Sequence, residues 1–458
     1  MMNDTIAAIA TAMSNSGIGI VRISGEDSIA IVDKIFKPKN KNKKLIQVDS
    51  HTIHYGFIYD NEEMIDEVMV LIMKNPNSYT KEDSVEIDCH GGILVVQRVL
   101  ETVIKYGARC ADPGEFTKRA FLNGRIDLSQ AEAVIDVINS KNKFALKNSL
   151  NQLKGSVHVE IEDIRKILIY HIAFIESALD DPEHVSLEGY SNTLEEVLNK
   201  LLLQINELII TANDGKILKE GIKTVIIGKP NAGKSSLLNY LVGEEKAIVT
   251  NIAGTTRDII EENINFNGVS LNIIDTAGIR DTEDIIEKIG VEKSIKYANE
   301  ADLIIYVVDS STKLDENDDK IIKMLKQSKS IILLNKTDLN IITSEETIKE
   351  KTNDTVIPIS LKEKIGIDLL EKEIVKMFFK GNIEFNDEVL ITNIRQKSLI
   401  SEAYDSLKLV EKSIISKISE DFYTIDLMNA YEKLGQVIGE SIEDDLVNQI
   451  FSKFCMGK

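Results

Sequence analysis

One short glycine-bearing segment constrains the fold of this chain more than any other: Gly228-Lys229-Pro230-Asn231-Ala232-Gly233-Lys234-Ser235-Ser236. It follows an apolar run, 224–227, and precedes a run with helical apolar spacing, 237–241. A strand, a glycine loop and a helix in this order are the context of a phosphate-binding loop, whose amides and helix N-terminus hold phosphate oxygens. We expect Lys234 to reach the β- and γ-phosphates and the Ser235 hydroxyl to bind Mg²⁺. The alternative is a chance match in a surface turn. The expected nucleotide contacts are Asn231, Ala232, Gly233, Lys234, Ser235 and Ser236.

The composition is that of a multidomain cytoplasmic protein. A length of 458 residues predicts two to four domains. No apolar run reaches the length of a membrane span, and the N-terminus lacks the features of a signal peptide. The three cysteines, at positions 89, 110 and 455, form no disulfide framework or metal spacing, which favours a reducing cytoplasm.

The charge balance limits how the chain can meet nucleic acid. The formal net charge of −20 argues against a broad non-specific nucleic-acid surface. The charge does not exclude action on RNA through a local basic patch or through a partner protein. The densest basic run, 37–44, is interpreted as a solvated loop, with an RNA contact as the alternative.

The N-terminal quarter, residues 1–118, is predicted to be a mixed α/β domain. Strand patterns cover 5–10, 19–25, 68–73 and 83–88, and a helix is expected over 93–106. Arg22 lies on the second of these strands, and an arginine on a short strand bounded by glycine usually marks an edge strand.

Helical spacing dominates 119–216. Apolar positions recur on one face at 131, 134, 135 and 138. A second helical face carries the apolar residues 164, 167, 168 and 175 together with His171. The run Asp180-Asp181-Pro182 separates two long helices.

Residues 217–378 alternate strands and helices, which predicts a doubly wound nucleotide-binding sheet. The strands are expected over 225–227, 259–265, 270–274, 303–308, 331–334 and 356–359. From 379 to 458 the pattern is helical again, with two seams: Ile400, Ala403, Leu407, Val410 and Ile414, and Leu427, Tyr431, Leu434 and Ile438. Because such apolar faces must be covered, we expect 119–216 and 379–458 to pack together as one discontinuous helical domain that carries the α/β domain as an insertion.

Three further motifs follow strand ends of the inserted domain. The first, Asp275-Thr276-Ala277-Gly278, fits the acidic motif near Mg²⁺. The second, Asn335-Lys336-Thr337-Asp338, resembles the guanine-recognition motif of GTPases, in which the carboxylate accepts from N1–H and the amine of the base and so favours GTP over ATP. The third, at Ser360-Leu361-Lys362, stands where such proteins brace the base with Ser-Ala-Lys. The added nucleotide contacts are Asp275, Thr276, Ala277, Gly278, Asn335, Lys336, Asp338 and Ser360.

A switch segment is expected over 250–258. Its nucleotide contacts are Thr250, Asn251, Ile252, Ala253, Gly254, Thr255 and Thr256, with Thr256 completing the Mg²⁺ shell. Ile279 occupies the place of the glutamine that orients water in Ras-like proteins. Hydrolysis therefore needs a water-positioning group and a counter-charge from elsewhere. A switch with negligible hydrolysis is the alternative.

These residues together resemble the MnmE (TrmE) family of tRNA-modification GTPases over essentially the whole chain. The resemblance rests on the segments 17–25, 77–80, 90–92, 113–116, 231–236 and 254–258 and on the terminal Phe454-Cys455-Met456-Gly457-Lys458, in which the family usually has Ile in place of Met456. It implies an N-terminal α+β folate-binding domain that dimerises, a discontinuous all-α helical domain and an inserted Ras-like P-loop GTPase domain.

The resemblance also supplies a catalytic set. It implies a K⁺ ion at the interface of two G domains, with Asn231, Thr250, Ile252 and Thr255 as ligands. Glu287 would activate water, and Arg257, Asp258 and Arg280 would couple dimerisation to activity. Lys234, which reaches the phosphates, completes the catalytic set. The alternatives are a solvated acid at a helix start for Glu287 and surface ion pairs for the others.

For folate, the resemblance implies Arg22, Glu86, Arg125 and Lys458. A carboxylate such as Glu86 accepts from the N–H and amino groups of a pterin, and basic groups suit the glutamate tail. Cys455 stands near this site. A functional thiol is one interpretation of it, and a packed, modest role is favoured.

The implied function is a K⁺-dependent, dimerisation-activated GTPase of tRNA modification. With a flavin-containing MnmG-type partner, in a heterotetramer or larger complex that binds tRNA, it would add an aminomethyl or carboxymethylaminomethyl group at C5 of the wobble uridine, position 34. The one-carbon donor would be 5,10-methylene-tetrahydrofolate. An Era- or Der-type ribosome-assembly GTPase is the alternative, and it predicts an RNA-binding domain with a Gly-x-x-Gly loop after residue 378. A dynamin-type membrane GTPase would need a lipid-binding loop that the sequence does not show.

Overall fold

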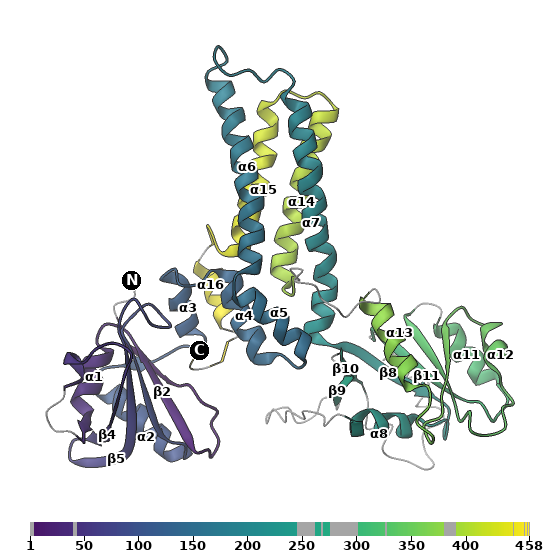
Figure 1. The fold of residues 1–458 in the computed structure, drawn as a ribbon, viewed down its shortest axis with the longest axis horizontal. Helices are drawn as coiled ribbons and strands as arrows, with labels where there is room; N and C mark the ends of the chain where they lie inside the picture. The colour runs from purple at the N-terminus through teal and green to yellow at the C-terminus, as the bar shows by residue number, and fades with distance from the viewer. Residues whose placement is uncertain are drawn as a thin grey trace. The chain divides into compact units, whose positions relative to one another are not determined.

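The computed structural model describes residues 4–39, 44–244, 262–266, 269–274, 301–325, 328–379, 391–442, 444–452, 454–455 and 457 (Figure 1). They divide into two compact units. The first comprises the described residues of 1–135, 152–174 and 427–458, and the second those of 136–151 and 175–426. Four helices contribute to both: α4 (Leu128–Asn139), α5 (Lys143–Leu153), α6 (Ser156–Asp180) and α15 (Asp421–Ile438). None of the helices in the described ranges combines the length and apolar character of a membrane span.

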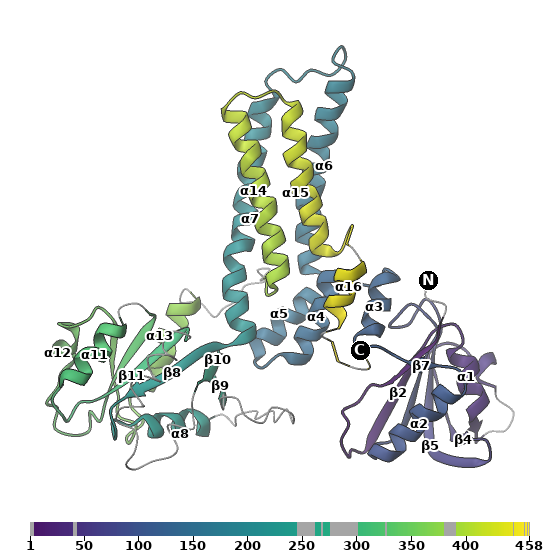
Figure 2. The ribbon, with the colours of Figure 1, turned by 180° about the vertical axis from the view of Figure 1, so that it is seen from behind.

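A seven-stranded sheet forms the base of the first unit, in the order β3-β4-β5-β6-β2-β1-β7. Neighbouring strands are antiparallel except β1 and β7. Two helices, α1 (Ser28–Ile35) and α2 (Ile93–Lys105), cover one face, where Val21, Ile23, Val85 and Ile87 are buried (Figures 1 and 2). The strands are β1 (Ile6–Ile9), β2 (Ile18–Ser24), β3 (Phe36–Pro38), β4 (Thr52–Asp60), β5 (Glu63–Met73), β6 (Ser84–His90) and β7 (Arg109–Cys110), with a 3₁₀ turn at Leu45–Gln47.

The prediction that Arg22 marks an edge strand is wrong. Strand β2 pairs with β1 on one side and with β6 on the other, so it lies inside the sheet. The charge is accommodated there because Glu86 stands directly opposite Arg22 in the β2–β6 register. Alternation places both side chains on the face away from α1 and α2.

That second face is covered only in part. Near β1, the helix α3 (Glu115–Leu122) packs Phe116 against Ile6 and Ala8. Helix α16 (Asp444–Phe451) then packs against α3 and α4. Over β4 and β5 the face is open, and Ile53 and Met69 are 64% and 43% exposed. The sheet domain therefore carries an apolar surface in the described residues.

The second unit contains a six-stranded sheet in the order β13-β12-β11-β8-β10-β9, parallel except for β9. Helices α8 (Lys234–Glu244) and α13 (Ile367–Phe379) pack on one face, and α11 (Glu316–Leu325) and α12 (Glu345–Lys349) on the other. The predicted doubly wound alternation is confirmed. The strands are β8 (Ile222–Gly228), β9 (Glu262–Phe266), β10 (Val269–Ile273), β11 (Leu303–Asp309), β12 (Ser330–Asn335) and β13 (Thr355–Pro358).

This sheet is a chain insertion between two helices that lie side by side, α7 (Tyr190–Glu220) and α14 (Ile394–Ile415) (Figures 1 and 2). The chain segment that leaves the helices and the segment that returns to them touch at Gly215. A Cβ on Gly215 would lie 2.3 Å from the Ile391 carbonyl oxygen. Buried Asp136 joins the same place, since it accepts from Thr392 Oγ1 at 3.2 Å and pairs with Lys219 at 2.7 Å. The expected packing of the two helical segments is confirmed here.

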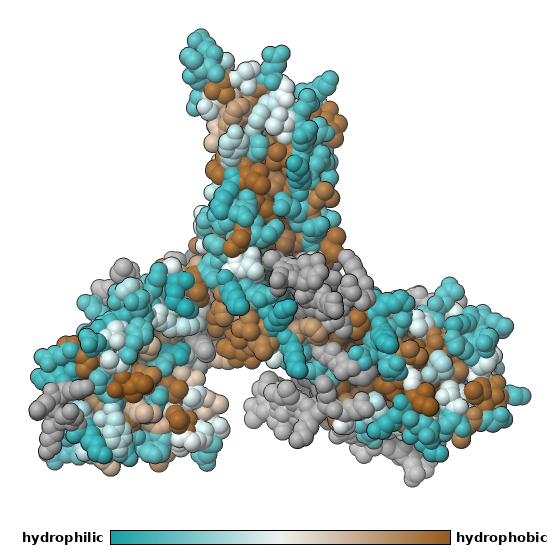
Figure 3. Space-filling model, viewed as in Figure 1, coloured by the Kyte–Doolittle hydropathy of each residue, from teal (hydrophilic) through white to brown (hydrophobic). Residues whose placement is uncertain are grey.

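The helical seams are largely as predicted. On α14 all five positions of the expected seam are buried. On α6, Ile164, Leu168 and Ile175 are buried, but Ile167 is 37% exposed because it lies about 60° around the helix from Ile164. Ile138, in the last turn of α4, is also exposed, against expectation. Figure 3 shows hydrophobic side chains along these long helices on the face in view.

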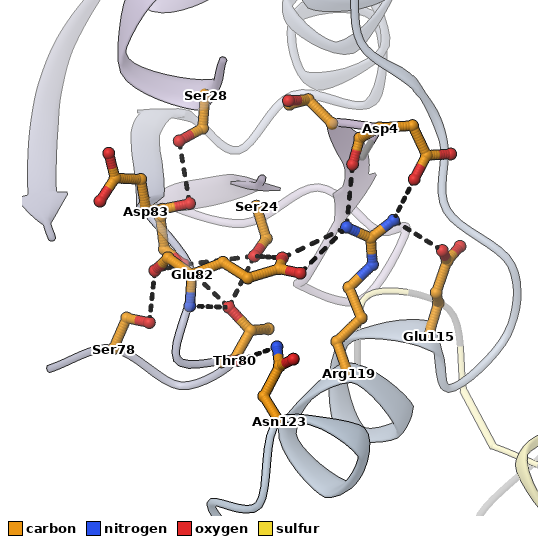
Figure 4. A network of polar contacts seen from close by, with 12 residues as sticks. Asp4, Ser24, Ser28, Ser78, Thr80, Glu82, Asp83, Glu115, Arg119 and Asn123 are labelled. Atoms are coloured by element: carbon orange, nitrogen blue, oxygen red, sulfur yellow. Dashed lines mark hydrogen bonds and ion pairs between the residues drawn. The ribbon is translucent and has the colours of Figure 1, made fainter. Parts of the chain in front are cut away.

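An ion network ties the N-terminus to α3 (Figure 4). The buried Arg119 donates to Asp4 Oδ1 at 2.8 Å and Glu115 Oε1 at 3.0 Å. Arg109 binds the same two carboxylates. The hydrogen bond from Arg109 holds the pKa of Asp4 below its ordinary value of 3.8. Burial acts to raise the pKa of Glu115, but the hydrogen bonds from Arg109, the Asp112 amide and Arg119 outweigh it and hold that pKa below 4.5.

This network predicts an acid limb in the stability of the first unit. Because both carboxyls have lower pKa values when folded, their contribution is fully present above their ordinary values and is lost as the pH falls through the folded ones. We expect Glu115→Gln to lower the melting temperature at neutral pH and to flatten its fall between about pH 5 and about pH 3. Melting curves over that range are the measurement, with Glu62→Gln in the exposed β4–β5 turn as the control. A Glu115→Gln curve parallel to that of the unmodified chain would contradict the assignment.

Candidate functional sites

The glycine segment forms a tight loop between β8 and α8. Three of its residues have positive φ: Gly228 (152°), Asn231 (60°) and Gly233 (111°). A Cβ on Gly228 would lie 2.4 Å from the Val307 carbonyl oxygen, and one on Gly233 would lie 2.1 Å from Asn335 Nδ2. Both positions therefore require glycine.

Lys234, the first residue of α8, points back over this loop. Its ammonium donates to the carbonyl oxygens of Gly228 at 2.8 Å and Lys229 at 2.7 Å. Burial lowers the pKa of Lys234. An ammonium group held over a backbone loop at a helix N-terminus is suited to bind phosphate oxygens. Ser235 and Ser236 follow in the first turn and are exposed.

The motif at the end of β12 lies against the same loop. Asn335 is buried, and its Nδ2 donates to the Ala232 carbonyl oxygen at 2.9 Å while its Oδ1 accepts from the Leu361 amide at 3.3 Å. One side chain thus joins the phosphate loop to the segment after β13. The carboxyl ends of β8, β12 and β13 meet at one edge of the sheet, which is where nucleotides bind in such folds.

Asp338 and Ser360 form the outer part of this edge. Ser360 Oγ donates to Asp338 Oδ1 at 2.7 Å, and this bond lowers the pKa of Asp338. Asp338 is thus held ionised in one orientation, as a hydrogen-bond acceptor for paired N–H groups. Lys336, at φ 64°, pairs with Asp309 at 2.6 Å.

Sequence reasoning missed a contact of the phosphate loop. Lys229 Nζ pairs with Asp315 at 2.7 Å and with the buried Asp318 at 2.5 Å, and Asp318 also accepts from Tyr306. These partners lie more than eighty positions away in the chain, so no local pattern signals the pairing.

Several expected nucleotide and metal residues lie outside the described residues. They are Thr250, Asn251, Ile252, Ala253, Gly254, Thr255, Thr256, Arg257, Asp258, Asp275, Thr276, Ala277, Gly278, Arg280 and Glu287.

The first unit brings a second set of expected residues together on the partly covered sheet face. Arg22 Nε donates to Glu86 Oε1 at 2.7 Å, and Nη1 donates to the Gly457 carbonyl oxygen at 3.1 Å. The C-terminal segment reaches this point because the Gly114 amide donates to the Cys455 carbonyl oxygen at 3.3 Å. Cys455 itself is exposed, and Lys458 lies outside the described residues.

Tyr79 is the centre of this set and was not singled out by sequence reasoning. The Arg22 guanidinium carbon lies 5.5 Å and that of Arg125 lies 4.4 Å from the centroid of its ring. The Tyr79 hydroxyl lies 2.9 Å from Thr117 Oγ1. Two guanidiniums, one carboxylate and one aromatic ring are suited to a ligand that is both anionic and heteroaromatic.

Comparisons with known proteins match the whole chain. The family model described as the MnmE helical domain matches residues 128–455, and that of the GTP-binding protein TrmE N-terminus matches 5–125. The tRNA modification GTPase MnmE of Lachnoclostridium phytofermentans is 60% identical over 458 residues and covers 100% of both chains. Those of Acetivibrio thermocellus and Clostridioides difficile are 50% and 48% identical over 99% and 100% of both chains. This chain therefore belongs to the MnmE (TrmE) family.

Proposed function

We propose that this chain is a tRNA-modification enzyme that hydrolyses GTP and uses the cycle to support modification of the wobble uridine. One observation carries the nucleotide half. Asn335 bonds at once to the phosphate loop and to the segment that bears Ser360, so base and phosphate ends of one site are built together. Asp338, fixed by Ser360, then selects guanine because it accepts from two donors that adenine does not offer.

The metals follow from the same loop. Ser235, with Thr256, would bind Mg²⁺ beside the phosphates. Asn231 stands in the loop with positive φ and an exposed side chain, so its amide oxygen fits a K⁺ ion shared with Thr250, Ile252 and Thr255. When bound, K⁺ supplies positive charge to the transition state. Glu287 would orient the attacking water, with Arg257, Asp258 and Arg280 reporting on G-domain pairing.

The cluster around Arg22 is proposed to bind folate. Glu86 suits the donors of a pterin, and Arg22, Arg125 and Lys458 suit carboxylates of the glutamate tail. The residues present fit such a ligand, since Tyr79 holds two guanidiniums over one ring on a partly open face. A methylene-tetrahydrofolate bound there would supply the one-carbon unit. Cys455, exposed beside this cluster, is a candidate functional thiol.

The assembly proposed is a homodimer that works with a flavin-containing MnmG-type partner on tRNA in the cytoplasm. The exposed Ile53, Tyr55 and Met69 on the open sheet face support pairing of two N-terminal domains. The three-part domain division, 1–118, 119–216 with 379–458, and 217–378, is part of this proposal. The ribosome-assembly alternative finds no support, because the described residues after 390 form helices α14, α15 and α16 and no strand.

Replacing one carboxylate should switch the base that is read. In Asp338→Asn an amide NH₂ replaces an acceptor, and this matches the C2 carbonyl of xanthine instead of the C2 amine of guanine. We expect GTP hydrolysis at limiting substrate to fall by about a hundredfold and xanthosine triphosphate hydrolysis to rise. Steady-state kinetics with both nucleotides check this, and an unaltered preference for GTP would contradict the assignment of Asp338.

Hydrolysis should depend on the alkali cation. We expect the rate to rise about tenfold or more when K⁺ replaces Na⁺ at equal ionic strength, because the smaller ion fits a K⁺ cage poorly. Asn231→Lys should abolish that rise. The matched control is Asn239→Lys, which adds the same charge to an exposed position of α8. Equal rates of the unmodified chain in the two salts would reject the K⁺ assignment.

A further inference from the structure

We propose that Glu82 and the buried Arg119 are positioning residues for folate binding, because they fix the loop that presents the Tyr79 ring to Arg22 and Arg125. The inference deepens the proposed folate site and rests on it. It adds residues outside the expected contact set and gives the ion network around α3 a role at that site.

The orientation of Arg125 depends on Tyr79. Within the described ranges, the Arg125 guanidinium has no hydrogen bond or ion pair, and it stacks on the Tyr79 ring. A guanidinium stacked on an aromatic face keeps its edge donors available for a carboxylate. Tyr79 therefore decides where Arg125 points, and its ring is also shared by Arg22.

Hydrogen bonds hold the loop on both sides of Tyr79, at its neighbours Ser78 and Thr80 (Figure 4). Before it, Ser78 Oγ donates to the Glu82 carbonyl oxygen at 2.6 Å. After it, the hydroxyl of the buried Thr80 lies 2.6 Å from Ser24 Oγ. The Thr80 carbonyl oxygen accepts from Asn123 Nδ2 at 2.7 Å. The ring is held by its neighbours in the chain as well as by its own hydroxyl.

Glu82 and Arg119 anchor that loop. The Glu82 carboxylate accepts from Ser24 Oγ at 2.8 Å and from Arg119 Nη1 at 3.2 Å. Arg119 is 2% exposed. Figure 4 shows its guanidinium between Glu82 on one side and Asp4 and Glu115 on the other. A buried guanidinium must keep its carboxylates, so Arg119 holds Glu82, and with it the Tyr79 loop, at a fixed distance from α3.

Arg109 separates this role from general stabilisation of the domain. Like Arg119, it binds the carboxylates of Asp4 and Glu115, but from the other side of the network. Within the part of the chain that the structure describes, the Arg109 guanidinium bonds to Asp4, Glu115 and the Cys110 carbonyl, and not to Glu82 or the Tyr79 loop. A change at Arg109 therefore weakens the network and spares the loop.

The test is calorimetric titration of the full chain with 5-formyl-tetrahydrofolate, a chemically stable folate, well below the melting temperature of each variant. Tyr79→Leu and Glu82→Ala should each weaken binding about tenfold. Glu82→Gln should recover most of the affinity, because the amide oxygen still accepts from Ser24 and Arg119. Arg109→Gln should lower the melting temperature at least as much as Glu82→Ala and leave the dissociation constant within about twofold.

Two results would overturn the inference. One is unchanged affinity in Glu82→Ala or in Tyr79→Leu while the unmodified chain binds the folate. The other is an affinity loss in Arg109→Gln as large as that in Glu82→Ala, which would reduce the network to stabilisation alone. Absence of folate binding by the unmodified chain would instead reject the proposed folate site itself. If Glu82→Ala does not fold, Tyr79→Leu and Glu82→Gln decide the question.

Discussion

The hydrogen bond from Arg22 to the Gly457 carbonyl joins the first strands of the chain to its last residues, and the candidate folate cluster depends on it. Gly457 must be glycine here, since it has φ of 81° and a Cβ would lie 2.3 Å from the Ile9 carbonyl oxygen. The segment is delivered by α16, whose Phe451 packs with Phe454 in the core beneath α3. The cluster is therefore complete only when both ends of the chain have folded together.

The inserted sheet also depends on two chain segments, distant in sequence, that meet in the structure. The chain leaves the helices after α7 and returns beside Gly215, where the absence of a side chain lets the Ile391 carbonyl approach. The G domain is attached to these helices by more than the covalent link. Asn142, which caps α5 through the Ala145 amide, also donates to Ser270 on β10, the strand that leads toward the Asp275 motif. The sheet that carries the phosphate loop is thus joined to the helices of the second unit by the hydrogen bond between Asn142 and Ser270.

Local patterns predict most elements but miss α1 and β4 of the first unit, and long-range pairing limits the prediction of the sites. The phosphate loop, the Asn335 motif and the seam of α14 have periods or spacings that a single segment reveals, and the structure places them as expected. The edge-strand prediction for Arg22 is wrong because tertiary pairing determines which strands are neighbours. A short strand length and flanking glycines do not encode that pairing. Tyr79 and Glu82 lie three positions apart in sequence, but their roles come from contacts with Arg125 and Arg119, about forty positions away. Ile167 shows the remaining error, because helical spacing finds a face and not its edges.

We propose that the guanine site and the Arg22 cluster serve one reaction on the wobble uridine. The most direct measurement is nucleoside mass spectrometry of tRNA from cells that lack this chain, carry it unmodified, or carry Lys234→Ala or Glu86→Leu. We expect loss of the C5 substituent without the chain, its return with the unmodified chain, and no return with either variant at equal protein levels. A normal level of modified uridine in cells without the chain would contradict the function. Full restoration by Glu86→Leu would contradict the role of the Arg22 cluster.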